Sequence, residues 1–387
     1  MRPWRDLPRP VLVLVAARAV NQLGAFTLPF LAVVLVRDRH ASLATAGLVT
    51  ALFGVATIPS RLAGGRLADR IGNRGTIVLG LTGCAGAQLA IAVGTSLVQA
   101  MVAAAVLGLA FELYEPPSQA MIADLTDAES RPRAFGLFGA ALAAGGVGAG
   151  VLATALGSVD LRLLFVADAV TCLACAAVVG LALPATPRRT SRERVAASPW
   201  RDPRLLVMLA VGTCFATLYL QIRVGLPLTM VERGMPAGQF GLLMTVSSVT
   251  VVLAQPLLAS RPASRLVPGN PFGAMRVGYL MLGAGLAGTG WASGLAGFLA
   301  TTVVWSVGDV LLLGLPFAIV SGLAPEGARG RYLAAYGICW GFAAVLAPLL
   351  GTRLLDTGGP HLLWLSCAAL AVALAAAQPV VRRVVAG

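Results

Sequence analysis

Long apolar segments alternate with short polar ones along the chain, and this pattern sets the expected architecture. About 20 residues cross the hydrocarbon core of a bilayer as a helix. The apolar residues run together instead of alternating with polar ones, which favours helices over the strands of a β-barrel. The sequence therefore predicts an all-α membrane protein with twelve transmembrane helices near residues 11–36, 45–65, 76–95, 97–122, 133–156, 161–184, 205–230, 239–260, 276–293, 296–322, 331–354 and 362–381.

Composition agrees with a lipid environment and narrows the partners. Of the 387 residues, 58% are hydrophobic and 12% are charged, whereas about a quarter of the residues of a soluble domain are charged. The formal net charge is +13, and all 29 basic residues are arginines. Because these arginines lie in short loops between apolar runs, they indicate membrane topology and a lipid bilayer as partner, and no nucleic acid is expected.

The distribution of arginines predicts the orientation of the chain. Arginines gather in alternate loops, and the positive-inside rule places those loops in the cytoplasm. Both termini are therefore expected on the cytoplasmic side of a bacterial inner membrane. A cleaved signal peptide is the alternative for the first segment, but its apolar run continues past the candidate cleavage site at Ala17–Ala19.

The two halves of the chain resemble each other. Trp4–Asp6 recurs as Trp200–Asp202, Pro59 recurs as Pro256, and other matches have offsets between 195 and 198 residues. Near-equal offsets in chain order indicate a duplicated unit of six spans, and an even number of spans makes the repeats parallel. The predicted domains are an N-terminal bundle over 1–184, a cytoplasmic linker over 185–204 and a C-terminal bundle over 205–387.

The loop between the second and third spans reads GRLADRIGNR over residues 65–74. This segment resembles the cytoplasmic signature of the major facilitator superfamily, and the repeat of six spans extends the resemblance over the whole chain. The resemblance implies a monomeric secondary transporter that works by alternating access, in which the signature forms a latch on the cytoplasmic side. The expected latch residues are Gly65, Asp69, Arg70, Gly72, Arg74, Asp124, Arg131 and Arg133. The alternative is a topology signal with a solvated turn.

Three departures from the family pattern concern the subtype. Asn73 stands at a basic position of the signature, and Ser264 replaces the acid in the second-half copy. The fifth span reads GGVGAG over 145–150, whereas drug antiporters of the family often have a Gly-Pro-rich signature there. The glycines of this span favour close helix packing.

Charged residues inside the spans are the candidates for coupling. A charge at the centre of a bilayer costs ~3 kcal/mol on insertion scales, so these residues are expected to be paired, neutral or in contact with water. Glu112 and Asp309 are separated by the repeat offset, which places them at equivalent sites in the fourth and tenth spans. The expected pairs are Arg18 with Glu112 and Arg223 with Asp309. The coupling and cavity set is Glu112, Asp309, Glu115, Arg18, Arg223, Asn21 and Gln22.

Two roles are open for these acids. They bind and release a coupling proton, or they form static ion pairs that lock helix packing. Asp168, in the sixth span, is a weaker candidate, because in the family this span usually packs away from the central cavity. The cysteines lie in apolar runs and the two histidines lie in predicted outer loops, so no metal site and no cofactor are expected.

The predicted function is secondary active transport of a small organic solute, driven by protons and directed outward. Few polar groups are expected in the cavity, which favours an amphipathic or apolar substrate. An importer of the same fold is the first alternative, and a transport-dead sensor or assembly partner is an alternative from another class. A membrane-embedded enzyme is disfavoured, because the sequence has no metal-protease motif and no nucleophile with a histidine in reach.

Overall fold

The computed structural model describes residues 7–24, 27–127, 131–184, 199–258, 270–325 and 329–386. Helices dominate these ranges, and no strand occurs within them. Seven helical segments there are long and apolar enough to cross a membrane, and two shorter apolar helices cover Ala144–Gly157 and Gln239–Ala254. One of the seven, Ala335–Val385, is 51 residues long and covers two of the predicted spans.

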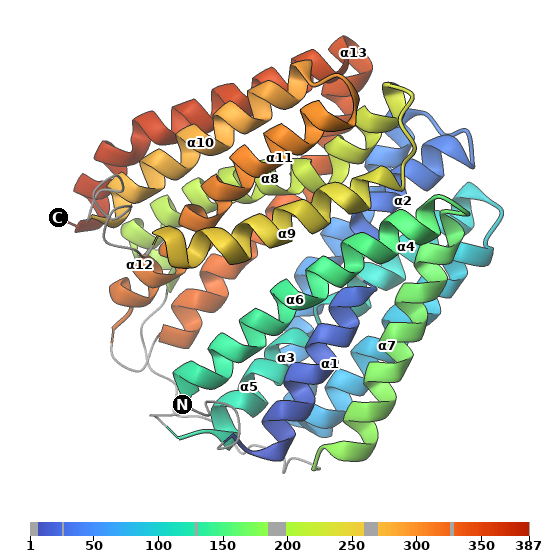
Figure 1. Ribbon diagram of the computed structural model, residues 1–387. Coiled ribbons are helices and arrows are strands. Elements are labelled where there is room, and N and C mark those ends of the chain that lie inside the picture. The colour runs from blue at the N-terminus through green and yellow to red at the C-terminus, as the bar shows by residue number, and fades with distance from the viewer. Residues whose placement is uncertain are drawn as a thin grey trace. The chain divides into compact units, whose positions relative to one another are not determined.

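Contacts divide the chain into two units. The first unit is Met1–Arg192 with Ala237–Thr245, and the second is Glu193–Pro236 with Val246–Gly387. The order of the helices can be followed by colour in Figure 1. Up to residue 182 the helices are α1 (Arg9–Leu23), α2 (Thr27–Arg37), α3 (Leu43–Val93), α4 (Leu97–Phe111), α5 (Glu115–Leu125), α6 (Arg131–Gly157) and α7 (Arg162–Ala182). From residue 199 they are η1 (Pro199–Arg201), α8 (Pro203–Glu232), α9 (Gln239–Leu258), α10 (Pro271–Trp291), α11 (Gly294–Leu312), α12 (Leu315–Leu323) and α13 (Arg329–Ala386).

Two predicted spans are broken helices within the described residues: the fourth divides between α4 and α5, and the tenth between α11 and α12. The first predicted span is described as α1 and α2, and residues 25 and 26 between them lie outside the described part. The breaks in the fourth and tenth spans, at 112–114 and 313–314, are close to equivalent positions of the sequence repeat. Two other pairs of spans run together as α3 and α13, each with one non-helical glycine, Gly72 (φ 82°) and Gly359 (φ 63°). Glycine adopts positive φ without the steric penalty of a Cβ.

Polar caps start several helices. Ser42 accepts a hydrogen bond from the backbone N–H of Thr45 at the start of α3. Ser96 and Gln99 form a reciprocal capping box at the start of α4. Asn270 caps α10 through two backbone N–H groups. These caps satisfy backbone donors that have no helical partner.

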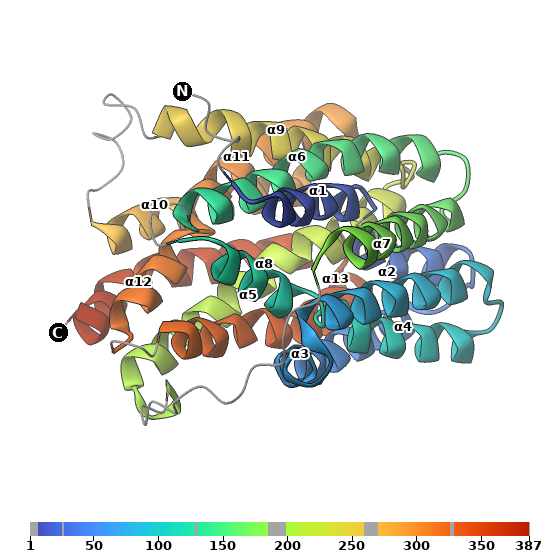
Figure 2. The same ribbon diagram turned by 90° about the horizontal axis from the view of Figure 1, so that it is seen from below.

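In the first unit, α3 packs along α4 and α7, as Figure 2 shows. The α3–α4 contact is close, because a Cβ on Gly108 would lie 2.7 Å from the Cβ of Ala56 and nearer still to the backbone oxygen of Phe53. α1 packs on α6 and α7. A Cβ on Gly145 of α6 would lie 2.6 Å from the backbone oxygen of Ala19, so this glycine of the fifth span serves close packing.

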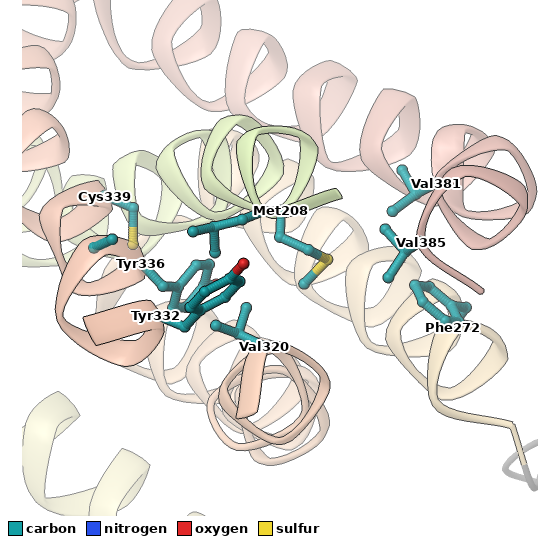
Figure 3. Packing of buried hydrophobic residues seen from close by; sticks show 10 residues of the cluster. Met208, Phe272, Val320, Tyr332, Tyr336, Cys339, Val381 and Val385 are labelled. Atoms are coloured by element: carbon teal, nitrogen blue, oxygen red, sulfur yellow. The ribbon is translucent and has the colours of Figure 1, made fainter. Parts of the chain in front are cut away.

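In the second unit, α8 packs along α13, and α10 packs against both α11 and α13. A buried cluster joins the two ends of α13 to the start of α8 (Figure 3). Tyr332 and Tyr336 come from the beginning of α13, and Val381 and Val385 come from its end. Both ends reach one cluster because the helix reverses direction at Gly359, between the predicted eleventh and twelfth spans.

The predicted domain bounds fall partly outside the described residues. Residues 185–198 of the expected linker lie outside the described residues. The remainder of the linker includes η1 and the start of α8 at Pro203. The bounds 1–184 and 205–387 stay a prediction.

Candidate transport site

The break in the fourth span brings together the acids that the sequence singled out. Glu112 is the C-cap of α4, and Glu115 is the first residue of α5. Prolines 116 and 117 follow, and proline is favoured in the first helical turn because its missing N–H is not needed there. The backbone N–H of Glu112 donates to Oγ of Ser60 on α3 (3.2 Å). α3 therefore packs directly against the break.

Each glutamate at the break pairs with a different arginine. Nη1 of Arg18, on α1, donates to Oε2 of Glu115, and Nε of Arg61, on α3, lies 3.5 Å from Oε2 of Glu112. The four side chains are between 16% and 32% exposed, so water partly screens both pairs. Oε1 of Glu115 also accepts a hydrogen bond from Gln119 (3.0 Å).

This pairing corrects the expected pair of Arg18 with Glu112. The expectation treated the fourth span as one continuous helix, in which Glu112 and Glu115 share a face. The helix stops before Glu112, so the two glutamates approach different neighbours. Arg61 was visible in the sequence as an arginine inside the second span, and that position was the signal for its role.

A chain of hydrogen bonds connects the break to the sixth predicted span. The hydroxyl of Tyr114, the N-cap of α5, donates to Oδ1 of Asn21 (3.1 Å), and Nδ2 of Asn21 approaches Sγ of Cys172 (3.3 Å). The thiol of Cys172 then lies 3.6 Å from Oδ1 of Asp168. Nε2 of Gln88, on α3, donates to Oδ2 of the same carboxyl (2.5 Å). We name Tyr114, Asn21, Cys172, Asp168 and Gln88 the polar chain.

Asp168 is more central than the sequence indicated. Its residue is 5% exposed, and it lies on the face of α7 that meets α1. Gly24, just after α1, is so close that a Cβ there would lie 2.7 Å from Cα of Asp168. The sequence signal was a lone aspartate inside an apolar run.

Gln22 packs at a contact between helices, whereas its neighbour Asn21 lines a cavity. A Cβ on Gly145 would lie 2.6 Å from the Cβ of Gln22, so Gln22 packs at the α1–α6 contact. Arg18, Asn21 and Tyr114 instead line a small cavity of about 20 Å³ among α1, α3, α5, α6 and α7. Gln22 is not among the residues that line this cavity.

In the second unit, Asp309 is a buried acid in the last turn of α11. Its residue is 2% exposed, and its Oδ1 has no hydrogen-bond partner among the described residues. Arg223, on α8, donates to the hydroxyl of Tyr219 (3.1 Å), and its guanidinium lies over the Tyr219 ring. Within the described ranges no ion pair joins Arg223 to Asp309, although the two are close enough to interact electrostatically. The expected direct pair is therefore replaced by a pair of Arg223 with Tyr219.

The signature motif is described only in part. Gly72 has φ 82° and ψ 162°, a conformation that favours glycine. Nη1 of Arg74 donates to the backbone oxygen of Leu183 at the end of α7 (3.2 Å), while Arg70 and Asp124 are exposed. The backbones of the remaining predicted latch residues, Gly65, Asp69, Arg131 and Arg133, lie in α3 and α6. The surroundings of Gly65 and the side chains of the other three are outside the described part of the structure. The latch stays a prediction.

In the ranges that the structure describes, no three histidine, cysteine, aspartate or glutamate side chains are arranged to hold a metal ion. Cys172 and Cys175 are buried free thiols, and Cys175 approaches the backbone oxygen of Ala17 (3.1 Å). The C-x-x-C spacing in this chain therefore contributes to helix packing.

Comparisons with known proteins identify the family. The profile described as Major Facilitator Superfamily matches residues 14–348 and 222–384. An uncharacterized MFS-type transporter, YqjV of Bacillus subtilis (strain 168), is 26% identical over 372 residues, covering 93% of this chain and 89% of that protein. The multidrug resistance protein MdtH of Klebsiella pneumoniae (strain 342) is 27% identical over 320 residues, covering 79% of this chain and 77% of that protein.

Solved structures share the fold at low sequence identity. An auto-inhibited POT family peptide transporter matches with a TM-score of 0.82 at 16% identity, over 97% of both chains. A D-xylose–proton symporter matches with a TM-score of 0.76 at 14% identity, over 95% of this chain and 96% of that chain. The predicted all-α membrane fold with two six-helix halves is confirmed.

Proposed function

We propose that this chain, which belongs to the major facilitator superfamily, exports a small amphipathic solute in exchange for protons. Secondary transport of a small molecule by a multi-pass bacterial membrane protein follows from its family and relatives. Proton coupling, outward direction and an uncharged or weakly polar substrate are the parts that we propose. We also propose that both termini are cytoplasmic and that the chain works as a monomer.

The buried position of Asp309 is the observation that best supports proton coupling. An ionised carboxylate that is buried without a directly paired cation or a hydrogen-bond donor is costly, at ~3 kcal/mol even on insertion scales. The buried position of Asp309, whose Oδ1 has no partner within the described ranges, therefore favours the neutral acid. Exposure of the same group to water in another conformation favours release of the proton. A carboxyl that alternates between these surroundings couples proton movement to a conformational change.

The glutamates of the fourth span complement this role. Glu112 and Glu115 each have an arginine partner in the described conformation, and each ion pair holds a neighbouring helix to the break. Protonation of either glutamate removes the attraction that holds α3 or α1 to the break. The division of labour that we propose gives Asp309 the proton in this conformation and gives Glu112 and Glu115 the control of the break.

Export is favoured over import by two supporting observations. Several relatives are named multidrug resistance proteins, among them MdtH of Klebsiella pneumoniae at 27% identity. The described polar groups of the first unit are largely engaged with one another, which suits an amphipathic substrate better than a highly polar nutrient. An importer of the same fold is the alternative, and the direction of gradient-driven flux separates the two.

Everted vesicles with an acidic interior test the proposal. In such vesicles a proton-driven exporter accumulates radiolabelled chloramphenicol, a neutral amphipathic drug, when the pH gradient is imposed. Asp309→Asn should remove the stimulation by the gradient and leave exchange of labelled for unlabelled drug. Asp356→Asn, at an exposed aspartate of α13, is the matched control and should behave like the parent.

Each other outcome has a definite meaning. Gradient-driven loss of drug from the vesicles would favour the importer. Equal stimulation by the gradient in the parent and in Asp309→Asn would remove Asp309 from coupling. Absence of drug flux, together with a cellular effect that persists after the proton gradient is collapsed, would favour the transport-dead sensor or assembly partner.

A further inference from the structure

Arg223 of α8 lies near two partners, one neutral and one acidic. Its Nη2 donates to the hydroxyl of Tyr219, one helical turn earlier (3.1 Å), and its guanidinium lies 5.6 Å from the centre of the Tyr219 ring. Asp309 of α11 is close enough to interact with the guanidinium electrostatically. The flexible apolar stem of an arginine lets its head group reach different partners. Arg223 must give up both contacts with Tyr219 in order to pair directly with Asp309.

The charge of Asp309 decides which of the two partners is favoured. A neutral carboxyl offers Arg223 no opposite charge, so the hydrogen bond and the cation–π contact hold the guanidinium on Tyr219. An ionised carboxylate attracts the guanidinium more strongly than a neutral hydroxyl does, and the pair of charges adds to the hydrogen bonds. A buried carboxylate without a partner is also strongly unfavourable. Loss of the proton from Asp309 therefore draws Arg223 away from Tyr219.

The helices around Asp309 supply little other charge. α10 and α12 pack against α11, and α12 has no ionisable side chain. On α10, Arg276 is exposed to solvent, and Tyr279 is a buried tyrosine, a side chain that is neutral near pH 7. α9, whose Ser247 shares a hydrogen bond with Ser306 of α11 (2.9 Å), has no ionisable side chain either. Among the described residues, Arg223 is the cation available to an ionised Asp309.

The ring that Arg223 covers belongs to an aromatic cluster between α8 and α13. Trp340 meets Tyr219 edge-on, with ring centres 5.3 Å apart and planes at 85°. Phe215 contacts both rings, at 6.4 Å from Tyr219 and 6.3 Å from Trp340. Phe215 is buried, whereas Tyr219 and Trp340 are partly exposed. Partly exposed rings bind an aromatic body by offset or edge-to-face stacking, and departure of Arg223 frees the covered face of Tyr219 for this purpose.

We propose that Arg223 moves from Tyr219 to Asp309 when Asp309 loses its proton, and that the uncovered ring of Tyr219, together with Trp340, binds the aromatic part of an uncharged solute. Return of the proton to Asp309 returns Arg223 to Tyr219 and weakens solute binding. Proton and solute therefore compete, as exchange requires. The inference rests on the proposed function in taking Asp309 as the proton carrier and this solute as the transported one. Stability and binding need no proton gradient, so both are measured separately from transport.

Thermal unfolding without any solute tests the exchange of partners. Tyr219→Phe keeps the ring and removes the hydroxyl that accepts from Arg223. It should lower the unfolding temperature by about 2–4 °C at acidic pH, the equivalent of one hydrogen bond to a charged group, and by less at alkaline pH. In the Asp309→Asn background the decrease should be the same at every pH, because an amide does not ionise. A decrease that is independent of pH in the parent background would overturn the exchange.

Binding of radiolabelled chloramphenicol to the purified full chain in lipid nanodiscs tests the solute site, with empty nanodiscs as the baseline for partition into lipid. The drug stays uncharged, and its affinity for the parent should rise about tenfold between acidic and alkaline pH. Asp309→Asn should bind at every pH as the parent does at acidic pH, which still permits exchange. Tyr219→Phe should bind about fivefold more tightly than the parent at acidic pH, because Arg223 holds its ring less firmly. Tyr219→Leu should bind weakly at every pH.

Tyr279→Phe is the matched control for both measurements. It removes the hydroxyl of another tyrosine of the second unit, one that has no hydrogen-bond partner among the described residues. Its effect on unfolding should not depend on pH, and its affinity for the drug should follow the parent.

The binding results also separate this inference from the proposed function. Equal affinity of the parent and Tyr219→Leu at alkaline pH, or no specific binding to the parent at any pH, would overturn the solute site. A rise with pH that persists in Asp309→Asn would overturn the competition. Gradient-driven flux with an affinity that does not change with pH rejects this inference and leaves proton-driven export intact. Binding that depends on pH through Asp309, without gradient-driven flux, does the reverse.

Discussion

Nε of Arg61 lies 3.5 Å from Oε2 of Glu112, and this pair joins α3 to the broken fourth span. The second glutamate at the break, Glu115, is held by Arg18 of α1. Side chains from α1 and α3 therefore both hold the interruption between α4 and α5. Such an interruption has fewer helical hydrogen bonds across it than a continuous helix, which makes it a site where a packed bundle can change shape.

The first prediction concerns this pair. Arg61→Met should leave Glu112 without a cation and lower the free energy of unfolding by about 1–2 kcal/mol, less than for a fully buried pair because both side chains are partly exposed. The double variant Arg61→Met with Glu112→Gln should recover most of the loss, since no charge is left unpaired. Chemical unfolding of the purified protein measures both. A double variant as unstable as Arg61→Met would show that packing, and not charge pairing, is what Arg61 provides.

The second prediction concerns the close approach of α3 and α4. Gly108→Ala places a methyl group 2.7 Å from the Cβ of Ala56 and nearer to the backbone oxygen of Phe53. The helices must move apart, at a cost of about 1–3 kcal/mol. Gly86→Ala, where a Cβ has no neighbour within 4 Å, is the control and should be neutral or slightly stabilising. Similar unfolding temperatures for the two variants would contradict the packing assigned here.

The third prediction concerns pH and a group outside the spans. Asp202 is the N-cap of α8. Partial burial favours its neutral form, but hydrogen bonds from the side chain and backbone of Arg204 and from the hydroxyl of Tyr332 outweigh it and hold the pKa of Asp202 below its ordinary value of 3.8. A lowered pKa in the folded state means that stability is present above the ordinary pKa and is lost as the pH falls through the folded value.

Asp202→Asn tests this dependence while keeping a good N-cap residue. The parent should lose stability as the pH falls below about 4, in the window that starts at the ordinary pKa of an aspartate. The variant should lose less over the same window, because it has no carboxylate to protonate. Thermal unfolding at a series of pH values gives the comparison. Parallel curves for the two proteins would contradict the role of the Asp202 carboxylate.

The fourth prediction concerns the signature loop, whose acid was assigned from sequence. Asp69→Asn removes the charge that is expected to hold the cytoplasmic ends together. Transport should fall while the amount of protein in the membrane stays the same, since the helices need no charge at this position. Drug flux and membrane abundance are measured on the same vesicles. Parent-like flux would reduce the motif to a topology signal.

Much of the fold could be predicted because its signals are local in the sequence. Apolar runs of sufficient length give the spans, and the repeat gives the two halves. The breaks were harder to place. Pro116 and Pro117 lie in the first turn of α5 beside one break, but Pro59 and Pro227 lie inside α3 and α8 without a break at either proline. Proline in a membrane helix is therefore not a sufficient sign of a break.

The partners of the charged residues could not be predicted for a related reason. Pairing depends on which face each helix presents after a break, and one interrupted turn is enough to separate Glu112 from Glu115. The charged residues themselves could be identified from the sequence, because charges inside apolar spans are unusual. It undervalued Asp168, because its role depends on Gln88, which donates to it directly, and on Asn21, to which Cys172 links it. Asn21 and Gln88 come from distant parts of the chain.

We propose that solute movement and proton movement share one carboxyl, Asp309, and solute-induced proton flux tests this coupling most directly. Proteoliposomes loaded with a pH-sensitive dye are given chloramphenicol without an imposed gradient, and the internal pH is followed. We expect a pH change in the parent and in Asp356→Asn, and none in Asp309→Asn, which should still exchange labelled drug. A pH change of equal size in Asp309→Asn, or drug flux in the parent with no proton movement, would contradict the coupling role of Asp309.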